Sequence, residues 1–193
     1  MRIGVLAAQG DFLEHIASLQ RLGVEAIPVR LPRDLVQIDG VIIPGGESTS
    51  ISKLMLDYNL AAEVKSLARE GLPVFGTCAG MILLAKDITD GNRVEPLRLM
   101  DIKVRRNAFG RQRESFEADL SITPLGDKPF HAIFIRAPII EQVSPGVKVL
   151  AKLDDGTIVA VREGKLLASA FHPELTDDLR FHQYFLDIVA GRQ

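Results

Sequence analysis

Short apolar runs alternate with amphipathic stretches through the first half of the chain. The apolar runs predict strands over residues 3–7, 25–29, 40–43 and 73–75. The spacing of apolar positions between them predicts helices over residues 11–22, ending at Gly23, and 49–69, with a break near Tyr58 and Asn59. Strongly apolar strands that alternate with helices are typical of a parallel sheet covered on both faces.

The second half of the chain has shorter runs, separated by turn sequences. The predicted strands here are residues 101–104, 115–120, 132–135, 147–153, 158–162 and 166–170. The turn at residues 154–156 and the turn at 163–165 indicate an antiparallel hairpin over 149–170, and a closing helix is predicted over 177–190. The expected fold is therefore an α/β three-layer sandwich with a mixed, mostly parallel central sheet.

Composition narrows the class of protein. The 193 residues are 47% hydrophobic and 25% charged, which is typical of a globular protein, and we expect a single domain over residues 1–193. A net charge of −2 favours neither nucleic acid nor a membrane as a partner. The N-terminal apolar run is too short for a membrane span and lacks a signal-peptide layout. The single cysteine excludes an intramolecular disulfide and fits the reducing cytoplasm.

The single cysteine, Cys78, lies in the sequence Gly76-Thr77-Cys78-Ala79-Gly80. An apolar strand precedes it, and residues 81–86 are compatible with a helix. A nucleophile on such a strand–turn–helix projects above the sheet, and the helix N-terminus favours the reactive thiolate. A small buried cysteine with a packing role is the alternative.

A second candidate group, His172-Pro173-Glu174, directly follows the apolar run 166–170. In an extended backbone, His172 and Glu174 point the same way, and Pro173 stiffens the link between them. One ring nitrogen of His172 then faces a thiol while the Glu174 carboxylate orients the other, as in a catalytic triad. The alternative is a turn with a surface ion pair, and the presence of Cys78 favours the triad.

These motifs resemble the class I (triad-type) glutamine amidotransferases. More narrowly, several stretches are similar to the glutaminase subunits of the two-subunit pyridoxal 5′-phosphate synthases, and together they cover essentially the whole chain. They are Leu6-Ala7-Ala8-Gln9-Gly10, Pro44-Gly45-Gly46-Glu47-Ser48-Thr49, Arg106-Asn107-Ala108-Phe109-Gly110-Arg111-Gln112, Ser115-Phe116-Glu117-Ala118-Asp119-Leu120, Phe134-Ile135-Arg136-Ala137-Pro138 and His172-Pro173-Glu174-Leu175-Thr176. Ala8 departs from the larger apolar residue expected there, which concerns local packing only.

The resemblance implies hydrolysis of L-glutamine to glutamate and ammonia, without a cofactor or metal. It implies a synthase (lyase) partner subunit, which takes the ammonia and builds pyridoxal phosphate within a large hetero-oligomer. Catalysis falls to Cys78, His172 and Glu174. The implied glutamine contacts are Gly46, Glu47, Ser48, Arg106, Ile135 and Arg136. Backbone N–H groups of Gly46 and Ala79 are the candidate oxyanion donors.

Other interpretations of these motifs stay open at this point. One is the glutaminase of another amidotransferase, such as imidazole glycerol phosphate synthase, and another is a cysteine hydrolase of similar fold. A non-catalytic module of the same fold is a third. Two alternatives exist for the loop 44–49. It could be a plain helix cap formed by Ser48 or Thr49, or a phosphate-binding loop, although the lysine of a phosphate-binding loop is absent.

Some polar residues are expected to have no role in the site. His15, His131 and His182 show no partner pattern, and we expect His15 and His182 at the surface or at an edge. Arg105 and Arg113 are expected in a solvated loop.

Three interpretations are open for Gln9. It supports the loop 44–49, which carries the candidate oxyanion donor Gly46 and is called the oxyanion loop below, or it contacts a partner, or it is a simple turn residue.

Overall fold

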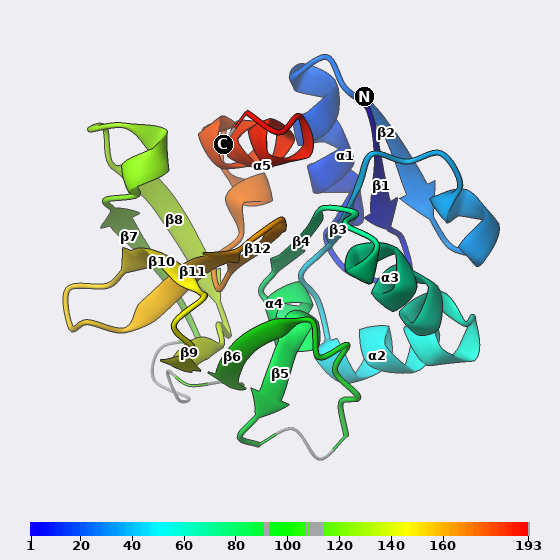
Figure 1. The fold of residues 1–193 in the computed structure, drawn as a ribbon. Helices are drawn as coiled ribbons and strands as arrows, with labels where there is room; N and C mark the ends of the chain where they lie inside the picture. The colour runs from blue at the N-terminus through cyan, green and yellow to red at the C-terminus, as the bar shows by residue number, and fades with distance from the viewer. Residues whose placement is uncertain (91–92, 107, 109–113, 193) are drawn as a thin grey trace.

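The computed structural model describes residues 1–90, 93–106, 108 and 114–192 (Figure 1). Ten strands of the described part form one mixed sheet. They are β1 (Arg2–Leu6), β2 (Glu25–Val29), β3 (Gly40–Ile43), β4 (Val74–Thr77), β5 (Ala85–Ile88), β6 (Met100–Arg105), β9 (Ile139–Val143), β10 (Lys148–Lys152), β11 (Ile158–Glu163) and β12 (Leu166–Ser169). Their order is β2-β1-β3-β4-β12-β11-β9-β6-β5, and β10 pairs with β11.

The sheet has a parallel half and a largely antiparallel half. Strands β2, β1, β3, β4 and β12 are parallel to one another. From β12 onwards, β11, β9 and β6 pair antiparallel, and the edge strand β5 returns to a parallel pairing. The predicted mixed sheet, with its antiparallel part from the second half of the chain, is confirmed.

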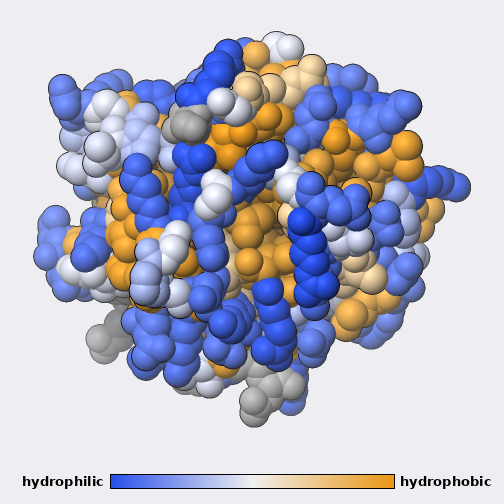
Figure 2. Space-filling model, in the orientation of Figure 1, coloured by the Kyte–Doolittle hydropathy of each residue, from blue (hydrophilic) through white to orange (hydrophobic). Residues whose placement is uncertain are grey.

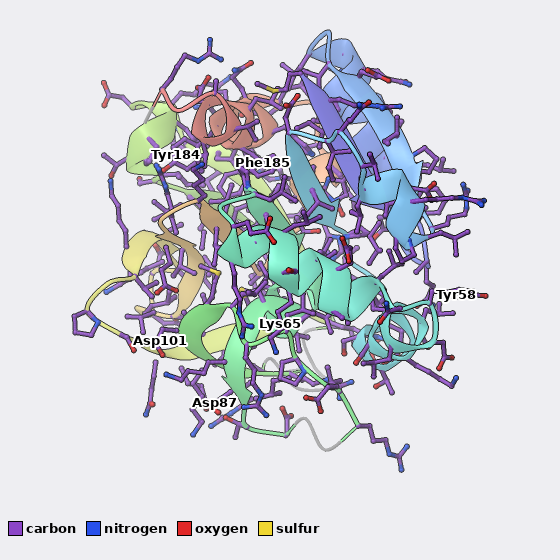
Figure 3. All side chains as sticks on the ribbon, turned by 45° about the vertical axis from the view of Figure 1, so that its right-hand side comes forward. Tyr58, Lys65, Asp87, Asp101, Tyr184 and Phe185 are labelled. Carbon is purple, nitrogen blue, oxygen red and sulfur yellow. The ribbon has the colours of Figure 1, made fainter. Side chains whose placement is uncertain are left out.

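Helices cover both faces of the sheet, as a three-layer sandwich requires. The helices α1 (Phe12–Arg21) and α5 (Arg180–Val189) lie on one face, where Phe75 of β4 packs against His15 and Phe185. The helices α2 (Ser48–Asp57), α3 (Leu60–Arg69) and α4 (Ala79–Leu84) lie on the other, where a Cβ on Gly76 would meet Gly80 of α4 at 2.6 Å. Figure 3 shows Phe185 on the inner side of α5.

The predicted break between the second and third helices is confirmed. Asn59 has a left-handed backbone (φ 59°), a conformation that asparagine tolerates better than most residues. Tyr58 beside it is 51% exposed and points outwards in Figure 3. The closing helix α5 begins at Arg180, three residues later than the predicted start.

Two strands, β5 and β9, were not predicted. The segment 81–86 had been interpreted as helical, but α4 ends at Leu84 and Ala85 pairs with Met100 of β6. The strand β9 follows Pro138 and contains Glu141 and Gln142, so its apolar run is too short to stand out in the sequence.

A two-stranded ribbon stands beside the main sheet. It consists of β7 (Ser115–Leu120) and β8 (Phe130–Ile135), and the rings of Phe116 and Phe134 stack across it at 4.5 Å. The backbone N–H of His172 donates to the Ile133 carbonyl of β8 at 2.8 Å. The ribbon is thereby held next to the end of β12, where the candidate histidine lies.

The core is built mainly from aliphatic side chains and a set of phenylalanines. The largest fully buried rings are Phe75, Phe130, Phe134, Phe171, Phe181 and Phe185. On the face seen in Figure 2, polar side chains surround patches of apolar surface. Within the described residues, no helix has the length and apolar character to cross a membrane.

Candidate active site

Cys78 sits on a strained turn between β4 and α4. Its backbone has φ 48° and ψ −101°, a conformation that costs energy in any residue except glycine. Its N–H donates to the Ser169 carbonyl of β12 at 2.8 Å, which ties the turn to the neighbouring strand. A Cβ on Gly80 would lie 2.0 Å from the Ile43 carbonyl oxygen, so the turn needs glycine there. The predicted strand–turn–helix around Cys78 is confirmed.

His172 and Glu174 pair as predicted, although by a different backbone route. His172 Nδ1 lies 2.7 Å from Glu174 Oε1, and both side chains are buried. The link is not extended, because Pro173 begins a 3₁₀ turn, η3 (Pro173–Leu175). Proline suits the first position of such a turn, since its missing N–H has no intrahelical partner there.

The charge on His172 is set by the groups around it. Burial lowers the pKa of His172, but its interactions with Asp11, Cys78 and Glu174 outweigh burial and raise the pKa above 6.5. Since Nδ1 is taken by Glu174, Nε2 is the nitrogen left for the Cys78 thiol. The Cys78 sulfur also lies 3.8 Å from the Ile135 carbonyl oxygen of β8. The site therefore favours an imidazolium between a sulfur and a carboxylate.

Two carboxylates face the same nitrogen of His172. Asp11 Oδ2 lies 3.4 Å from Nδ1, and its hydrogen bond to His172 holds the pKa of Asp11 below its usual range. Burial raises the pKa of Glu174, against the effect of His172. Asp11, His172 and Glu174 also place potential metal-ligand atoms within 4.8 Å of one another. The hydrogen bond from His172 Nδ1 to Glu174 explains why these side chains lie together, and a metal ion is not needed to explain it.

The loop between β3 and α2 reaches over His172 because it contains glycines. A Cβ on Gly45 would lie 2.4 Å from His172 Cε1, closer than any side chain allows. Gly46 has φ +141°, and a Cβ on Gly10 would lie 1.8 Å from the Gly45 carbonyl oxygen. The backbone of Gly46 is thus held near the triad, and its N–H stays a predicted oxyanion donor, as does that of Ala79, the first residue of α4.

Glu47 caps the helix that follows this loop. Its carboxylate accepts from the backbone N–H groups of Thr49 and Ser50 at 3.0 and 2.7 Å. Burial raises the pKa of Glu47, but these hydrogen bonds outweigh it and lower the pKa to about 2. The cap expected from Ser48 or Thr49 is therefore made by Glu47, while Ser48 is the buried first residue of α2.

The remaining predicted glutamine contacts come from the residue after β6 and from the end of β8 in the ribbon. Arg106 Nη2 lies 3.6 Å from Glu47 Oε1 and 3.5 Å from Thr49 Oγ1, so Arg106 faces the oxyanion loop. The carbonyl of Ile135 faces Cys78. The side chain of Arg136 is 71% exposed and points to Glu114, with 3.7 Å between Nη2 and Oε2.

Other expectations for arginines have mixed outcomes. Arg105 is not in a solvated loop, because it is the last residue of β6 and forms an ion pair with Glu141. Asn107 and residues 109–113, which include Arg113, lie outside the described residues.

The expectation that two histidines lie at the surface is wrong. His15 and His182 are both 0% exposed, and His15 Nδ1 lies 2.9 Å from His182 Nε2. The buried positions of α1 are 15, 18 and 19, which is the spacing of an apolar helix face and could have placed His15 inside. His131 is exposed but paired, with Asp119 and Glu117 each 2.8 Å from a ring nitrogen.

Comparison with known proteins identifies relatives across the chain. Residues 5–190 match the model of the SNO glutamine amidotransferase family. A protein of Herpetosiphon aurantiacus, named pyridoxal 5′-phosphate synthase subunit PdxT, is 59% identical over 97% of this chain and 100% of its own length. A protein of the same name from Moorella thermoacetica is 59% identical over 98% of this chain and 100% of its own.

Solved structures agree with the family match. A crystal structure of a glutamine amidotransferase superposes with a TM-score of 0.92 at 50% identity, covering 97% of this chain and 98% of that one. The structure of PurLQS from Thermotoga maritima matches with a TM-score of 0.68 at 17% identity, covering 96% of this chain and 97% of that one. At that identity the likeness shows a shared fold.

Proposed function

Because the chain belongs to the SNO glutamine amidotransferase family, we propose that it is the glutaminase subunit of a pyridoxal 5′-phosphate synthase. It hydrolyses L-glutamine to L-glutamate and ammonia and delivers the ammonia to the synthase subunit. The observation that carries this proposal is the strained Cys78 turn beside a buried His172–Glu174 pair. The names of the relatives favour this synthase over an imidazole glycerol phosphate synthase, and the family favours a glutaminase over another cysteine hydrolase.

The first half of the reaction forms a thioester. The proton of the Cys78 thiol lies on His172 Nε2, and the Cys78 thiolate attacks the side-chain carbonyl carbon of glutamine. Backbone N–H groups of Gly46 and Ala79 stabilise the oxyanion of the tetrahedral intermediate. His172 then protonates the leaving nitrogen, the carbon–nitrogen bond breaks, and ammonia leaves the glutamyl thioester on Cys78.

The second half returns the enzyme to its starting state. His172 removes a proton from water, which attacks the thioester carbonyl carbon. The second tetrahedral intermediate collapses, the carbon–sulfur bond breaks, and glutamate leaves the Cys78 thiolate beside the His172 imidazolium. Glu174 holds the ring of His172 in one orientation through Nδ1 and stabilises its charged form.

Residues around the oxyanion loop bind the substrate in this proposal. The guanidinium of Arg106 suits the α-carboxylate of glutamine, because its planar donors match two carboxylate oxygens. Gly46, Ser48, Ile135 and Arg136 line the site through their backbone. The Glu47 carboxylate faces the α-ammonium of glutamine while it also accepts the two backbone hydrogen bonds that cap α2.

The proposal extends to the surroundings of the enzyme. Residues 1–193 form a single glutaminase domain. The ammonia acceptor sits on a partner subunit in a large hetero-oligomer, since the relatives are named as subunits of a synthase. Glutaminase activity is low in the isolated protein and rises when the partner docks. This coupling is useful because ammonia released without the partner is lost to water. A free catalytic thiol fits the cytoplasm. Neither nucleic acid nor a membrane is a partner.

The test measures ammonia released from L-glutamine by the purified protein, with and without a pyridoxal phosphate synthase subunit. Cys78→Ala is the control. Activity that requires Cys78 and increases with the partner supports the proposal. Equal activity with and without the partner contradicts the coupling and the pathway. No ammonia in either mixture, from folded protein and a competent partner, contradicts the glutaminase itself.

A further inference from the structure

The acid of the triad has a second buried neighbour. Glu174 uses Oε1 for His172, at 2.7 Å, while Oε2 lies 3.3 Å from Nε2 of His15 in α1. Both side chains have no exposed surface. Resting on the proposed glutaminase function, we propose that His15 is a positioning residue, which holds Glu174 and, through it, the ring of His172.

An arrangement of protons that gives Glu174 Oε2 a donor fixes the roles of the groups around His15. A carboxylate only accepts, so Nε2 of His15 carries the hydrogen that faces Glu174 Oε2. Nδ1 of His15 must then accept, which makes Nε2 of His182 the donor at 2.9 Å. His182 is left with a bare Nδ1, and within the described residues this buried nitrogen has no hydrogen-bond partner. The chain of donors thus runs from α5 through α1 to Glu174.

Burial keeps both histidines neutral, as this arrangement requires. Burial, followed by the charges of His182 and His172, lowers the pKa of His15 well below 6.5. Burial lowers the pKa of His182 to about 4. Neutral rings can each donate and accept once, which a chain of this kind needs.

In this arrangement the His15 N–H lies beside two acceptors, Thr77 Oγ1 and Glu174 Oε2. It meets hydrogen-bond geometry at Thr77 Oγ1, 3.2 Å away, whereas Glu174 Oε2 has no bond of that quality in the described residues. Thr77 precedes Cys78 on β4, so His15 lies between the nucleophile's strand and the acid's turn. A buried carboxylate oxygen needs a donor, and His15 is the group in place to supply it.

Loss of His15 would free Glu174 to turn. Its main competitor for His172 Nδ1 is Asp11, 3.4 Å away. The titratable groups that face the pair are Asp11 before α1, His15 on α1, Cys78 after β4 and His182 on α5. If the imidazolium is held less well, the Cys78–His172 pair forms only at higher pH. Since His15 does not touch the substrate, kcat should fall with little change in KM.

The test compares His15→Met, which removes the donor, with His15→Gln, which keeps an N–H at the side-chain end. Phe185→Leu is the control for loss of packing, because Phe185 packs on Phe75 from α5 and has no hydrogen-bonding side-chain group. For each variant in complex with the synthase subunit, kcat and KM for glutamine are measured. The pH dependence of Cys78 alkylation by iodoacetamide and the thermal midpoint complete the set.

We expect His15→Met to lower kcat about tenfold to a hundredfold and to move the acidic limb of the alkylation profile up by about one pH unit. His15→Gln should keep kcat and the acidic limb close to the wild-type values. Phe185→Leu should lower the thermal midpoint without moving the acidic limb of the alkylation profile. The proposal would be overturned if folded His15→Met kept the wild-type kcat and the wild-type acidic limb. It would also be overturned if His15→Gln were as impaired as His15→Met. An inactive wild type would instead overturn the glutaminase function.

A second measurement needs no variant. Nitrogen-15 NMR of the wild-type imidazoles should show His15 and His182 neutral near pH 7, each protonated on Nε2 and bare on Nδ1. Protonation of His15 on Nδ1 would overturn the proposal, because Glu174 Oε2 would then face a lone pair.

Discussion

The two halves of the central sheet differ in regularity, and the candidate site divides along that difference. The parallel half, from β2 to β12, pairs in continuous register, and its strand ends carry Cys78 and His172. The antiparallel half contains register shifts in the pairs β10–β11, β5–β6 and β6–β9, and it leads to Arg106. The groups proposed for bond making thus lie on the regular half, and Arg106, a proposed glutamine contact, follows the irregular one.

This division suits the demands of each task. Chemistry needs atoms held to within a fraction of an ångström, which regular strands and tight glycine contacts provide. Binding tolerates more variation, and loops beside an irregular sheet supply side chains from several directions. Substitutions in the regular half should therefore change kcat, while those in the other half should mainly change KM.

The largest effect is expected at Cys78. Replacement by glycine removes the nucleophile and also the strain of a side chain at φ 48°. We expect Cys78→Gly to lose at least about a thousandfold in glutaminase rate while its unfolding free energy stays equal or rises by about 1 kcal/mol. Ammonia release and chemical denaturation measure the two effects. Marked destabilisation would mean that the turn is not strained by the cysteine.

Gly45 tests the precision of the regular half. A methyl group there would collide with the His172 ring at 2.4 Å, so Gly45→Ala should displace the ring. We expect kcat to fall about a hundredfold, the cost of a misplacement near 1 Å. Gly146→Ala is the matched control, because a Cβ there meets only Glu163 Oε1 at 4.0 Å. Equal kcat values for the two variants would show that His172 adapts to the loop.

The binding of glutamine is tested by two arginines of unequal placement, Arg106 after β6 of the irregular half and Arg136 after β8 of the ribbon. Arg106 faces the oxyanion loop, with its side chain 18% exposed, whereas the side chain of Arg136 is 71% exposed and faces Glu114. Arg106→Met should raise KM for glutamine about tenfold or more, the value of one charged hydrogen bond. Arg136→Met should change KM less than about threefold, as exposed pairs do. A larger effect at Arg136 would reverse this assignment.

The sequence predicted the regular half of the molecule better than the irregular half. The strands of the parallel half are strongly apolar, and the glycines around Cys78 mark a turn that few other residues permit. The edge strand β5 and the interrupted strand β9 carry polar residues, so their pairing depends on neighbours that are distant in sequence. The pattern of residues within one strand does not show which distant strand it pairs with.

The side-chain network was also only partly predictable. The pairing of His172 with Glu174 follows from their closeness in sequence, although the backbone between them is a 3₁₀ turn. His15 and His182 were interpreted as isolated residues, and their contact spans 167 positions. Glu47 was overlooked as a cap because Ser48 and Thr49 are more typical cap residues, and the loop geometry decided between them.

The smallest expected effect concerns Glu47, which lies in the loop after β3 of the parallel half. Its pKa falls from 4.5 to about 2 on folding, because the donors of α2 outweigh burial. A lowered folded pKa contributes stability that is present above pH 4.5 and is lost as the pH falls towards 2. Glu47→Gln should therefore cost about 1 kcal/mol or less near pH 6, as the loss of a helix cap does.

Denaturation curves of Glu47→Gln and wild type at several pH values measure this difference. It should shrink steadily between pH 4.5 and about 2, because the wild-type carboxylate is protonated in the unfolded chain first and in the folded protein only near pH 2, where it resembles the amide. Thr49→Val keeps the backbone N–H but removes a hydroxyl that helps to lower the pKa of Glu47, so it should weaken that pH dependence only in part. A difference that stays constant down to pH 2 would mean that Glu47 supports α2 through packing and not through charge.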